Sequence, residues 1–388
     1  HPFGLDYAKL LARASADAPF VAISPDADLA VKYTSGTTGV PKGCVRTHRQ
    51  LIMASATNLV HIPQLEGDRA TISSPLAAGA AISLLALYVL GGTTMILLPK
   101  FDATRLLETI EREAVTIAYA NGSLFPRVAF HPDLDRCDLS SLRIFSGSSS
   151  SPTANMAEGL GNFRDHATFR GSFFSAYASS EGGGRVSYLM PADCERALTD
   201  RGSAHLLTSV GRAVRLGRIE AMDEDLRQLP AGEVGEMAVR APSVFKGYWN
   251  RPEETAQVLR DGWLMTGDLV RKDDEGFCYI AGRLRDVIRS GGMNVYPAEV
   301  EPVLASHEKI ANAAIVGVVD EKWGEKIIAC VVARDGCTED EILAFCRERL
   351  AGHKRPKQVV FLESLPMNAN AKVLKDDLRK MLEEETPQ

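Results

Sequence analysis

Short apolar runs alternate with amphipathic stretches along the first part of this chain, and that alternation limits the fold more than any other feature of the sequence. The stretch DATRLLETIERE, residues 102–113, places its leucines and its isoleucine on one face and begins at Asp102, a suitable N-cap, so a helix is predicted there. Strands and helices in alternation favour parallel sheets covered by helices, so roughly the first two thirds of the chain is predicted to be α/β. The predicted strands lie at residues 29–33, 70–74, 93–98, 115–118 and 142–145.

The segment between Arg69 and Lys100 carries no charged residue. A membrane-spanning helix needs only about 20 apolar residues, so this segment resembles one in composition. Prolines and glycines at positions 75, 79, 91, 92 and 99 nevertheless divide it into short pieces. We therefore predict a buried helix at SLLALYVL (83–90), then a buried strand at TTMILL (93–98), and no membrane span.

A second unit is predicted beyond the segment GRLRDVIRSGG at residues 282–292. It contains a helix that starts at Pro297, two strands (AAIVGVV and KIIACVVA), a helix with a capping box from Thr338 to Glu341, a strand (KQVVFLE) and a final charged helix. Such a series suits a compact α+β domain of about 100 residues. The predicted domains are a large one over residues 1–285 and a small C-terminal one over residues 286–388.

Charge and cysteine content favour small-molecule chemistry in a reduced compartment. The net charge of −6, without any run of Lys or Arg, argues against a general nucleic-acid binder. The N-terminus lacks the basic and apolar regions of a signal peptide. A cytoplasmic setting fits best and a zinc site is not expected, because the cysteines are scattered, without a C-x-x-C pair or a His at ligand spacing. They lie at positions 44, 137, 194, 278, 330, 337 and 346.

Residues 33–43 read YTSGTTGVPKG and directly follow the first predicted strand. Glycine-rich loops that leave a strand often surround phosphate, because glycines let several backbone N–H groups converge on an anion. A Walker P-loop is the obvious alternative. It is excluded because Pro41 replaces its second Gly and Gly43 replaces the hydroxyl that binds magnesium.

Several separated motifs together resemble one family, the adenylate-forming ligases, and among them most closely the acyl-CoA and aryl-CoA synthetases. The loop YTSGTTGVPKG is close to that family's phosphate-binding signature, and the other motifs follow in the family's order. They are YASSE (177–181), GYWNRPEET (247–255), DGWLMTGDL (261–269), GRLRD (282–286), SGGMNVYPAEVE (290–301) and NANAKVLKDDLR (368–379). The resemblance implies an enzyme that converts a carboxylate and ATP to an acyl-adenylate and pyrophosphate, then transfers the acyl group to CoA.

The resemblance also implies roles for individual residues. Glu181 would ligate Mg²⁺, a hard ion that prefers oxygen, and Asp268 would accept hydrogen bonds from the ribose hydroxyls. Lys372 would stabilise the negative charge that develops on the carboxylate and the α-phosphate. The implied catalytic set is Lys372, Thr38 and Glu181. The residues implied for binding ATP or AMP are Thr34, Ser35, Gly36, Thr37, Thr38, Gly39, Lys42, Gly147, Ser148, Tyr177, Ala178, Ser179, Ser180, Asp268, Tyr279 and Arg283.

By the same resemblance the small domain is mobile and turns about a hinge at Asp286. In one orientation it would bring Lys372 inward for adenylation. In the other it would present the loop Ser290, Gly291 and Gly292 to the thiol of CoA.

The chain departs from the family pattern around the acyl pocket. SPLAAGAA, residues 74–81, replaces a bulky pair, so Ala77, Ala78 and Gly79 predict a wider pocket, and SGSSSSPT (146–153) adds hydroxyls. A polar or aromatic acid is therefore favoured over an ordinary fatty acid. Arg185 could pair with a second carboxylate of the substrate, although a surface position is the commoner one for arginine.

The chain is also short at its start, since only residues 1–32 precede the phosphate loop, where the family has a whole subdomain. If that subdomain is missing, exposed apolar surface and weakened activity are expected. Two alternatives to a CoA ligase stay open: an adenylating enzyme with a carrier-protein thiol or another nucleophile as acceptor, and a nucleotide-binding protein that has lost turnover. Neither the acid nor the oligomeric state follows from the sequence.

Overall fold

The computed structural model describes residues 6–17, 20–34, 41–74, 76, 79–121, 124–148, 155–334, 336–367 and 373–384. A central seven-stranded sheet has the order β4-β3-β5-β6-β7-β8-β9, parallel from β4 to β7 and antiparallel from β7 to β9. Its strands are β3 (Arg69–Ile72), β4 (Thr94–Leu97), β5 (Ile117–Asn121), β6 (Ile144–Ser148), β7 (Ser172–Ser179), β8 (Gly184–Leu189) and β9 (Arg212–Ala213). The predicted parallel α/β arrangement is confirmed for this sheet.

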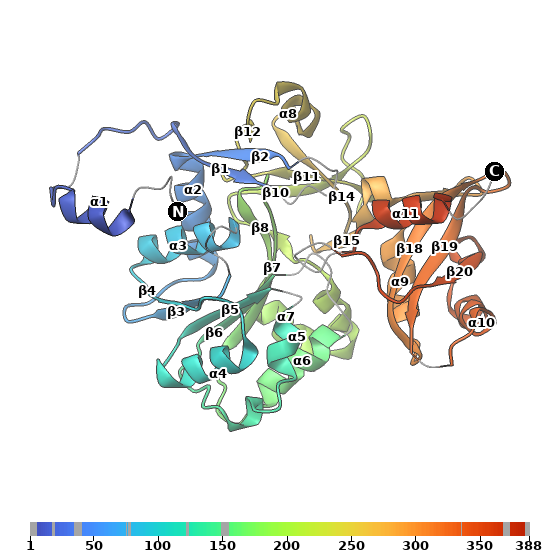
Figure 1. Ribbon diagram of the computed structural model, residues 1–388, viewed down its shortest axis with the longest axis horizontal. Helices are drawn as coiled ribbons and strands as arrows, with labels where there is room; N and C mark the ends of the chain where they lie inside the picture. The colour runs from blue at the N-terminus through green and yellow to red at the C-terminus, as the bar shows by residue number, and fades with distance from the viewer. Residues whose placement is uncertain are drawn as a thin grey trace.

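Helices cover both faces of the central sheet (Figure 1). Along β5 the side chains alternate, so that Ile117 and Tyr119 pack towards one core and Ala118 and Ala120 towards the other. The first core is covered by α2 (His48–His61) and α3 (Gly79–Gly91), and the second by α4 (Ala103–Arg112), α5 (Phe125–Ala129), α6 (Asn155–Asp165) and α7 (Pro191–Thr199). The predicted N-cap of α4 is confirmed, since Asp102 Oδ1 accepts the N–H of Arg105 at 2.9 Å.

Helix α3 corresponds to the predicted buried helix, but only one of its faces is buried. Leu84, Leu87 and Tyr88 pack under the sheet, whereas Val89 and Leu90 are exposed. None of the helices in the described ranges combines the length and the apolar character that crossing a bilayer requires. The uncharged segment thus supplies one helix to the core, as predicted. The prediction of a buried strand at residues 93–98 is wrong, since β4 lies at the edge of the sheet and Leu97 is 53% exposed.

Two antiparallel sheets lie beside the central one (Figure 1). The first contains β1 (Asp28–Tyr33), β2 (Gly43–Thr47) and β12 (Gly247–Tyr248), and the second contains β10 (Arg218–Met222), β11 (Val234–Arg240), β13 (Leu259–Arg260), β14 (Trp263–Lys272) and β15 (Cys278–Arg283). The prediction of a parallel partner for the first strand, residues 29–33, is therefore wrong. Nine residues between β1 and β2 are too few for a parallel crossover, which needs a dozen or more.

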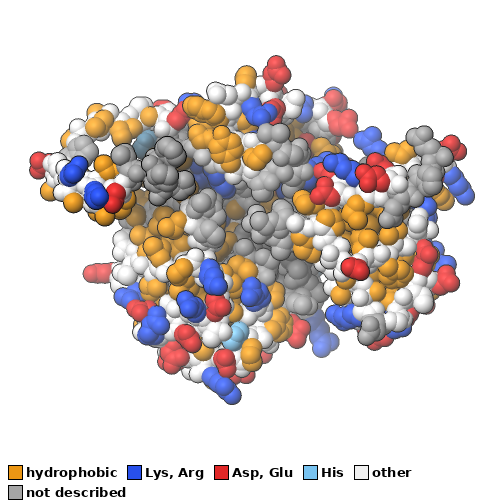
Figure 2. Space-filling model, viewed as in Figure 1, with side chains coloured by type: hydrophobic (Ala, Val, Ile, Leu, Met, Phe, Trp, Pro, Cys, Tyr) orange, Lys and Arg blue, Asp and Glu red, His pale blue; other side chains and the backbone are white. Residues whose placement is uncertain are grey.

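Apolar side chains are exposed on the outer side of β1 and near β12. Leu29, Val31, Tyr33 and Trp249 are each between 38% and 62% exposed. Figure 2 shows hydrophobic side chains gathered at the top of the molecule over this sheet. The short helix α1 (Tyr7–Arg13) has no buried residue.

The C-terminal unit is the α+β arrangement predicted from the sequence, and it stands to one side of the large part of the chain (Figure 1). Its sheet consists of β16 (Ile288–Ser290), β17 (Met293–Val295), β18 (Ile310–Asp320), β19 (Gly324–Ala333) and β20 (Gln358–Phe361). One face packs on α9 (Pro297–Ala305) and α10 (Glu339–Arg349), and the other on α11 (Lys375–Glu384). Pro297 opens α9, and Thr338 caps α10 by accepting the N–H of Glu341 at 3.3 Å.

Candidate active site

A buried carboxylate links β14 to β7. Asp268 of β14 lies opposite Arg283 of β15 in the strand register, and Arg283 Nε lies 2.9 Å from Asp268 Oδ1. The other carboxylate oxygen accepts the hydroxyl of Tyr177 at the end of β7. Burial holds the pKa of Tyr177 well above its usual range, and the negative charge of Asp268 adds to this effect. The hydroxyl therefore stays protonated and acts as a donor. Asp268 is thus fixed in one orientation, with carboxylate lone pairs remaining for a ligand.

The turn after β7 brings Glu181 beside Tyr248. Gly183 has a φ of +79°, and a Cβ there would lie 1.7 Å from the carbonyl oxygen of Ser243, so the turn packs directly on the segment leading to β12. The N–H of Phe245 donates to the carbonyl oxygen of Glu181 at 2.8 Å. As a result, the Tyr248 hydroxyl donates to Glu181 Oε1 at 2.8 Å. Burial and then the Glu181 carboxylate raise the pKa of Tyr248.

Lys42 at the end of the phosphate-type loop joins this group. Its ammonium lies 5.1 Å from the ring centroid of Tyr248 and 2.8 Å from Glu254 Oε2. Arg251 Nη1 donates to Glu254 Oε1 at 2.6 Å, so one carboxylate binds two cations. Both ends of the loop are held by Thr34, whose N–H donates to the carbonyl oxygen of Lys42 at 2.9 Å.

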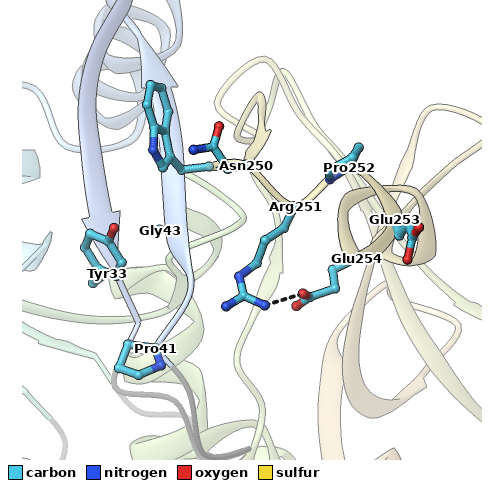
Figure 3. A pocket seen from close by; sticks show the side chains of 9 residues that line it. Tyr33, Pro41, Gly43, Asn250, Arg251, Pro252, Glu253 and Glu254 are labelled. Carbon is cyan, nitrogen blue, oxygen red and sulfur yellow. Dashed lines mark hydrogen bonds and ion pairs between the residues drawn. The ribbon is translucent and has the colours of Figure 1, made fainter.

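A cavity of about 620 Å³ opens next to this ion pair. Figure 3 shows Tyr33 and Pro41 on one side of it and the paired side chains of Arg251 and Glu254 on the other. The remaining lining residues are Gly43, Trp249, Asn250, Pro252 and Glu253. Glu254, which pairs with Lys42, therefore borders open space large enough for a small-molecule ligand.

The YASSE segment accommodates Ala178, which stands where the family pattern has glycine. The ladder between β7 and β8 is irregular between Tyr177 and Ala178, and Ala178 is not among the residues with positive φ, so an alanine fits without backbone strain. Ser179 Oγ accepts the N–H of Gly182 at 2.8 Å, and the carbonyl oxygen of Ser180 accepts the N–H of Gly183. The serines thus shape the turn that carries Glu181.

Gly147 and Ser148 end β6, at the carboxyl edge of the parallel strands, which is where ligands bind in open α/β sheets. Tyr279, by contrast, is not brought to the group around Asp268. It lies four positions along the hairpin from Arg283, about 13 Å at the usual rise per residue, and its hydroxyl donates to Asp273 at 2.9 Å. Its ring contributes to the core beneath the hairpin instead.

Arg185 does not have the surface position that base rates favour. The side chain lies between the rings of Tyr119 and Phe174, with its guanidinium carbon 5.6 Å from each centroid. It donates to Asn58 Oδ1 at 3.2 Å and to Ser146 Oγ at 3.4 Å. The structure therefore places this arginine inside the large part of the chain.

The residues predicted for the hinge and the thiol side lie together in the C-terminal unit. Asp286 is 9% exposed, and its Oδ1 lies 3.4 Å from Arg379 Nη2 of α11. Gly291 and Gly292 form the two-residue turn between β16 and β17 with φ values of +59° and +77°, the pattern of a type I′ hairpin. Ser290, just before them, is buried.

Eight predicted site residues fall outside the described residues: Ser35, Gly36, Thr37, Thr38, Gly39, Ala77, Ala78 and Lys372. Gly79 begins α3. The roles of Tyr248 and Glu254 did not follow from the sequence. Both stand in the motif GYWNRPEET, so the motif marked the segment but not which of its side chains reach Lys42 and Glu181.

Two family models match this chain. That of the AMP-binding enzymes matches residues 5–249, and that of the AMP-binding enzyme C-terminal domain matches residues 299–372. A feruloyl-CoA synthase of Amycolatopsis sp is 37% identical over 351 residues, which cover 90% of this chain and 68% of that protein.

Solved structures of ligases are also similar to this chain. The o-succinylbenzoate CoA synthetase of Bacillus subtilis, in complex with its acyl-adenylate intermediate, superposes with a TM-score of 0.84 at 31% identity, over 97% of this chain and 74% of that one. An amide bond synthetase of Marinactinospora thermotolerans gives 0.78 at 31% identity, over 92% and 70%.

Proposed function

This chain belongs to the family of AMP-binding enzymes, and we propose that it is an ATP-dependent ligase that joins a carboxylic acid to the thiol of CoA through an acyl-adenylate. The observation that carries the proposal is the contact of Glu181 and Lys42 with the same tyrosine, Tyr248. A carboxylate suited to Mg²⁺ and a cation suited to phosphate are thereby held side by side.

Two bond exchanges make up the reaction. First, a carboxylate oxygen bonds to the α-phosphorus of ATP while the bond from that phosphorus to the oxygen of the β-phosphate breaks, so pyrophosphate leaves. Second, the CoA sulfur bonds to the acyl carbon, the bond from that carbon to the AMP oxygen breaks, and the thiol proton is released to solvent. In this proposal Lys42 and the loop at residues 34–42 bind the departing phosphates, and Asp268 with Arg283 orients the ribose.

Glu181 fits a magnesium ion that arrives with the nucleotide. No cluster of three or more His, Cys, Asp or Glu side chains occurs among the described residues. Mg²⁺ in such sites takes one or two carboxylates and completes its shell with phosphate oxygens and water. When bound, it would offset the charge of the phosphates. The hydrogen bond from Tyr248 fixes the orientation in which Glu181 would hold it.

Pyrophosphate exchange tests the proposal. Purified chain, ATP, Mg²⁺ and labelled pyrophosphate are incubated with a panel of acids, and CoA is then added to the acids that respond. Exchange followed by formation of an acyl-CoA is expected for at least one acid. Exchange without an acyl-CoA would indicate another acceptor, such as a carrier-protein thiol or an amine. Measurable ATP binding without exchange would indicate a nucleotide-binding protein.

The ion pair between Lys42 and Glu254 predicts a change in ATP affinity. Glu254 competes with phosphate for the Lys42 ammonium, and partly exposed ion pairs are worth about 0.2–1 kcal/mol. Glu254→Gln should therefore lower the Kd for ATP by up to about five-fold, measured by calorimetry. Glu253→Gln, at the neighbouring carboxylate, should leave the Kd unchanged. Weaker ATP binding in Glu254→Gln would show that Glu254 assists the nucleotide instead.

We also propose that the two domains meet at residues 285 and 286 and turn about Asp286, and this predicts which half-reaction a proline impairs. Proline fixes φ near −65° and so limits the backbone rotation that a hinge needs. Asp286→Pro should lower thioester formation roughly tenfold more than pyrophosphate exchange. Asp286→Ala is the matched control, because it also removes the contact with Arg379 but leaves rotation possible. Equal loss of both half-reactions in the proline variant would contradict the hinge.

A further inference from the structure

Arg185 is a partly buried charged group without a charged partner among the described residues. Its hydrogen bonds go to the neutral side chains of Asn58 and Ser146, and the titratable groups that act on it are tyrosines. The rings of Tyr119 and Phe174 each lie 5.6 Å from the guanidinium carbon. Cation–π contacts compensate only part of the free energy lost when a guanidinium leaves water.

A second arginine lies next to this one. Arg46 of β2 is 5% exposed, its Nη1 donates to Ser83 Oγ at 3.3 Å, and its Nε has no partner in the described part of the chain. Ser83 of α3 also borders Gly184, since a Cβ on that glycine would lie 3.9 Å from its Oγ. Gly184 precedes Arg185, so both cations flank one contact between α3 and β8.

Buried charges in proteins are as a rule paired, because a lone buried ion is destabilising by several kcal/mol. Nowhere in the described ranges does Arg46 or Arg185 form an ion pair, whereas the half-exposed Arg196 does. An anionic group on a ligand would supply the negative charge that these two arginines lack in the described part of the chain.

The surroundings of Arg185 favour the acid substrate over the nucleotide as the source of that anion. Tyr119, Phe174 and Tyr188 belong to the core between the central sheet and helices α2 and α3, whereas Tyr177, the partner of Asp268, belongs to the neighbouring core. Aromatic walls with one cation suit an organic group that ends in an anion. Phosphates need several donors, which the loop at residues 34–42 can offer.

We propose that the acid activated by this protein carries a second carboxylate, and that Arg185 binds it at the far end of the acyl pocket while Arg46 strengthens the positive field. This inference rests on the proposed function and names its substrate class, a dicarboxylic acid. A carboxylate can accept two N–H groups of one guanidinium, so Arg185 would fix the substrate in position as well as neutralise its charge.

The test compares dicarboxylic acids, aliphatic and aromatic, with their monomethyl esters in pyrophosphate exchange. The wild-type chain should prefer a diacid over its monoester by at least about 100-fold in kcat/KM, since a site built to bind a charged group rejects the analogue that lacks it. Arg185→Met should bring that ratio to about one or below, and Arg185→Lys should keep an intermediate preference. Arg196→Met removes a half-exposed arginine that is paired with Glu275 and should leave the preference for diacids unchanged.

Each further outcome decides a different point. If monoesters are used as well as diacids and Arg185→Met affects both equally, Arg185 is structural and the inference is overturned, while the ligase function stands. If no acid of either kind supports exchange but ATP binds, the proposed function fails and the inference fails with it. Thermal melting of both Arg185 variants separates loss of folding from loss of selectivity, and the lysine variant keeps the charge if the methionine variant does not fold.

Discussion

Replacing Lys372 by alanine is expected to lower the rate of acyl-adenylate formation by about 10²- to 10³-fold, the usual effect of removing one preorganised charge from a transition state. In the proposed reaction Lys372 contacts the carboxylate and the α-phosphate, where negative charge builds up as the new bond forms. ATP binding should be nearly unchanged, because the loop at residues 34–42 and Asp268 bind the rest of the nucleotide. Pyrophosphate exchange measures the first quantity, and calorimetry with ATP the second.

A neighbouring lysine gives the matched control. Lys375 begins helix α11, and its Nζ lies 2.7 Å from Glu301 Oε1, a carboxylate oxygen that also accepts the N–H of Ile315. Lys375→Ala should therefore lower the free energy of unfolding by about 1 kcal/mol without slowing exchange. Exchange at the wild-type rate in Lys372→Ala would contradict the assignment of that residue. A chemically prepared acyl-adenylate supplied to Lys372→Ala should still yield acyl-CoA, which separates the two half-reactions.

The sequence predicted those parts of the fold that local chemistry determines. The N-cap of α4 at Asp102, the start of α9 at Pro297 and the cap of α10 at Thr338 each depend on residues within one turn of the chain. The pairing of β1 was misjudged because alternating apolar residues do not show which strand lies beside it, and in β1 those residues, Leu29, Val31 and Tyr33, are exposed. The nine residues to β2 hold the better signal, the length of the connection.

The candidate site was predicted residue by residue from motifs, but the contacts within it were not. Lys42 meets Glu254 because α8 (Pro252–Val258) packs against the end of β2 through β12, a contact between segments two hundred residues apart. Arg185 was expected at the surface because most arginines lie there. Its partly buried position results from the turn after Glu181, which directs β8 back along β7 and under α2 and α3.

The pairing of Asp268 with the half-exposed Arg283 and the buried Tyr177 leads to the second large effect. In Asp268→Ala, Arg283 loses its ion pair and the hydroxyl of Tyr177, which is 3% exposed, loses its acceptor. An unsatisfied buried donor is destabilising by about 1–3 kcal/mol, so the free energy of unfolding should fall by that amount. The KM for ATP should rise about 10- to 100-fold as well, because a carboxylate that accepts hydrogen bonds from a ribose diol contributes about 1.5–3 kcal/mol.

A control within the same hairpin separates these two effects. Asp273 lies near the turn between β14 and β15, where it accepts the hydroxyl of Tyr279 at 2.9 Å and the N–H of Phe277 at 2.8 Å. Asp273→Ala should therefore destabilise the protein by a similar amount, measured by urea unfolding, while the KM for ATP stays within about twofold of the wild-type value. If both variants raised the KM for ATP equally, hairpin stability rather than the Asp268 carboxylate would explain the loss. A selective effect of Asp268→Ala would instead mean that the carboxylate held by Arg283 and Tyr177 is the group that contacts the nucleotide.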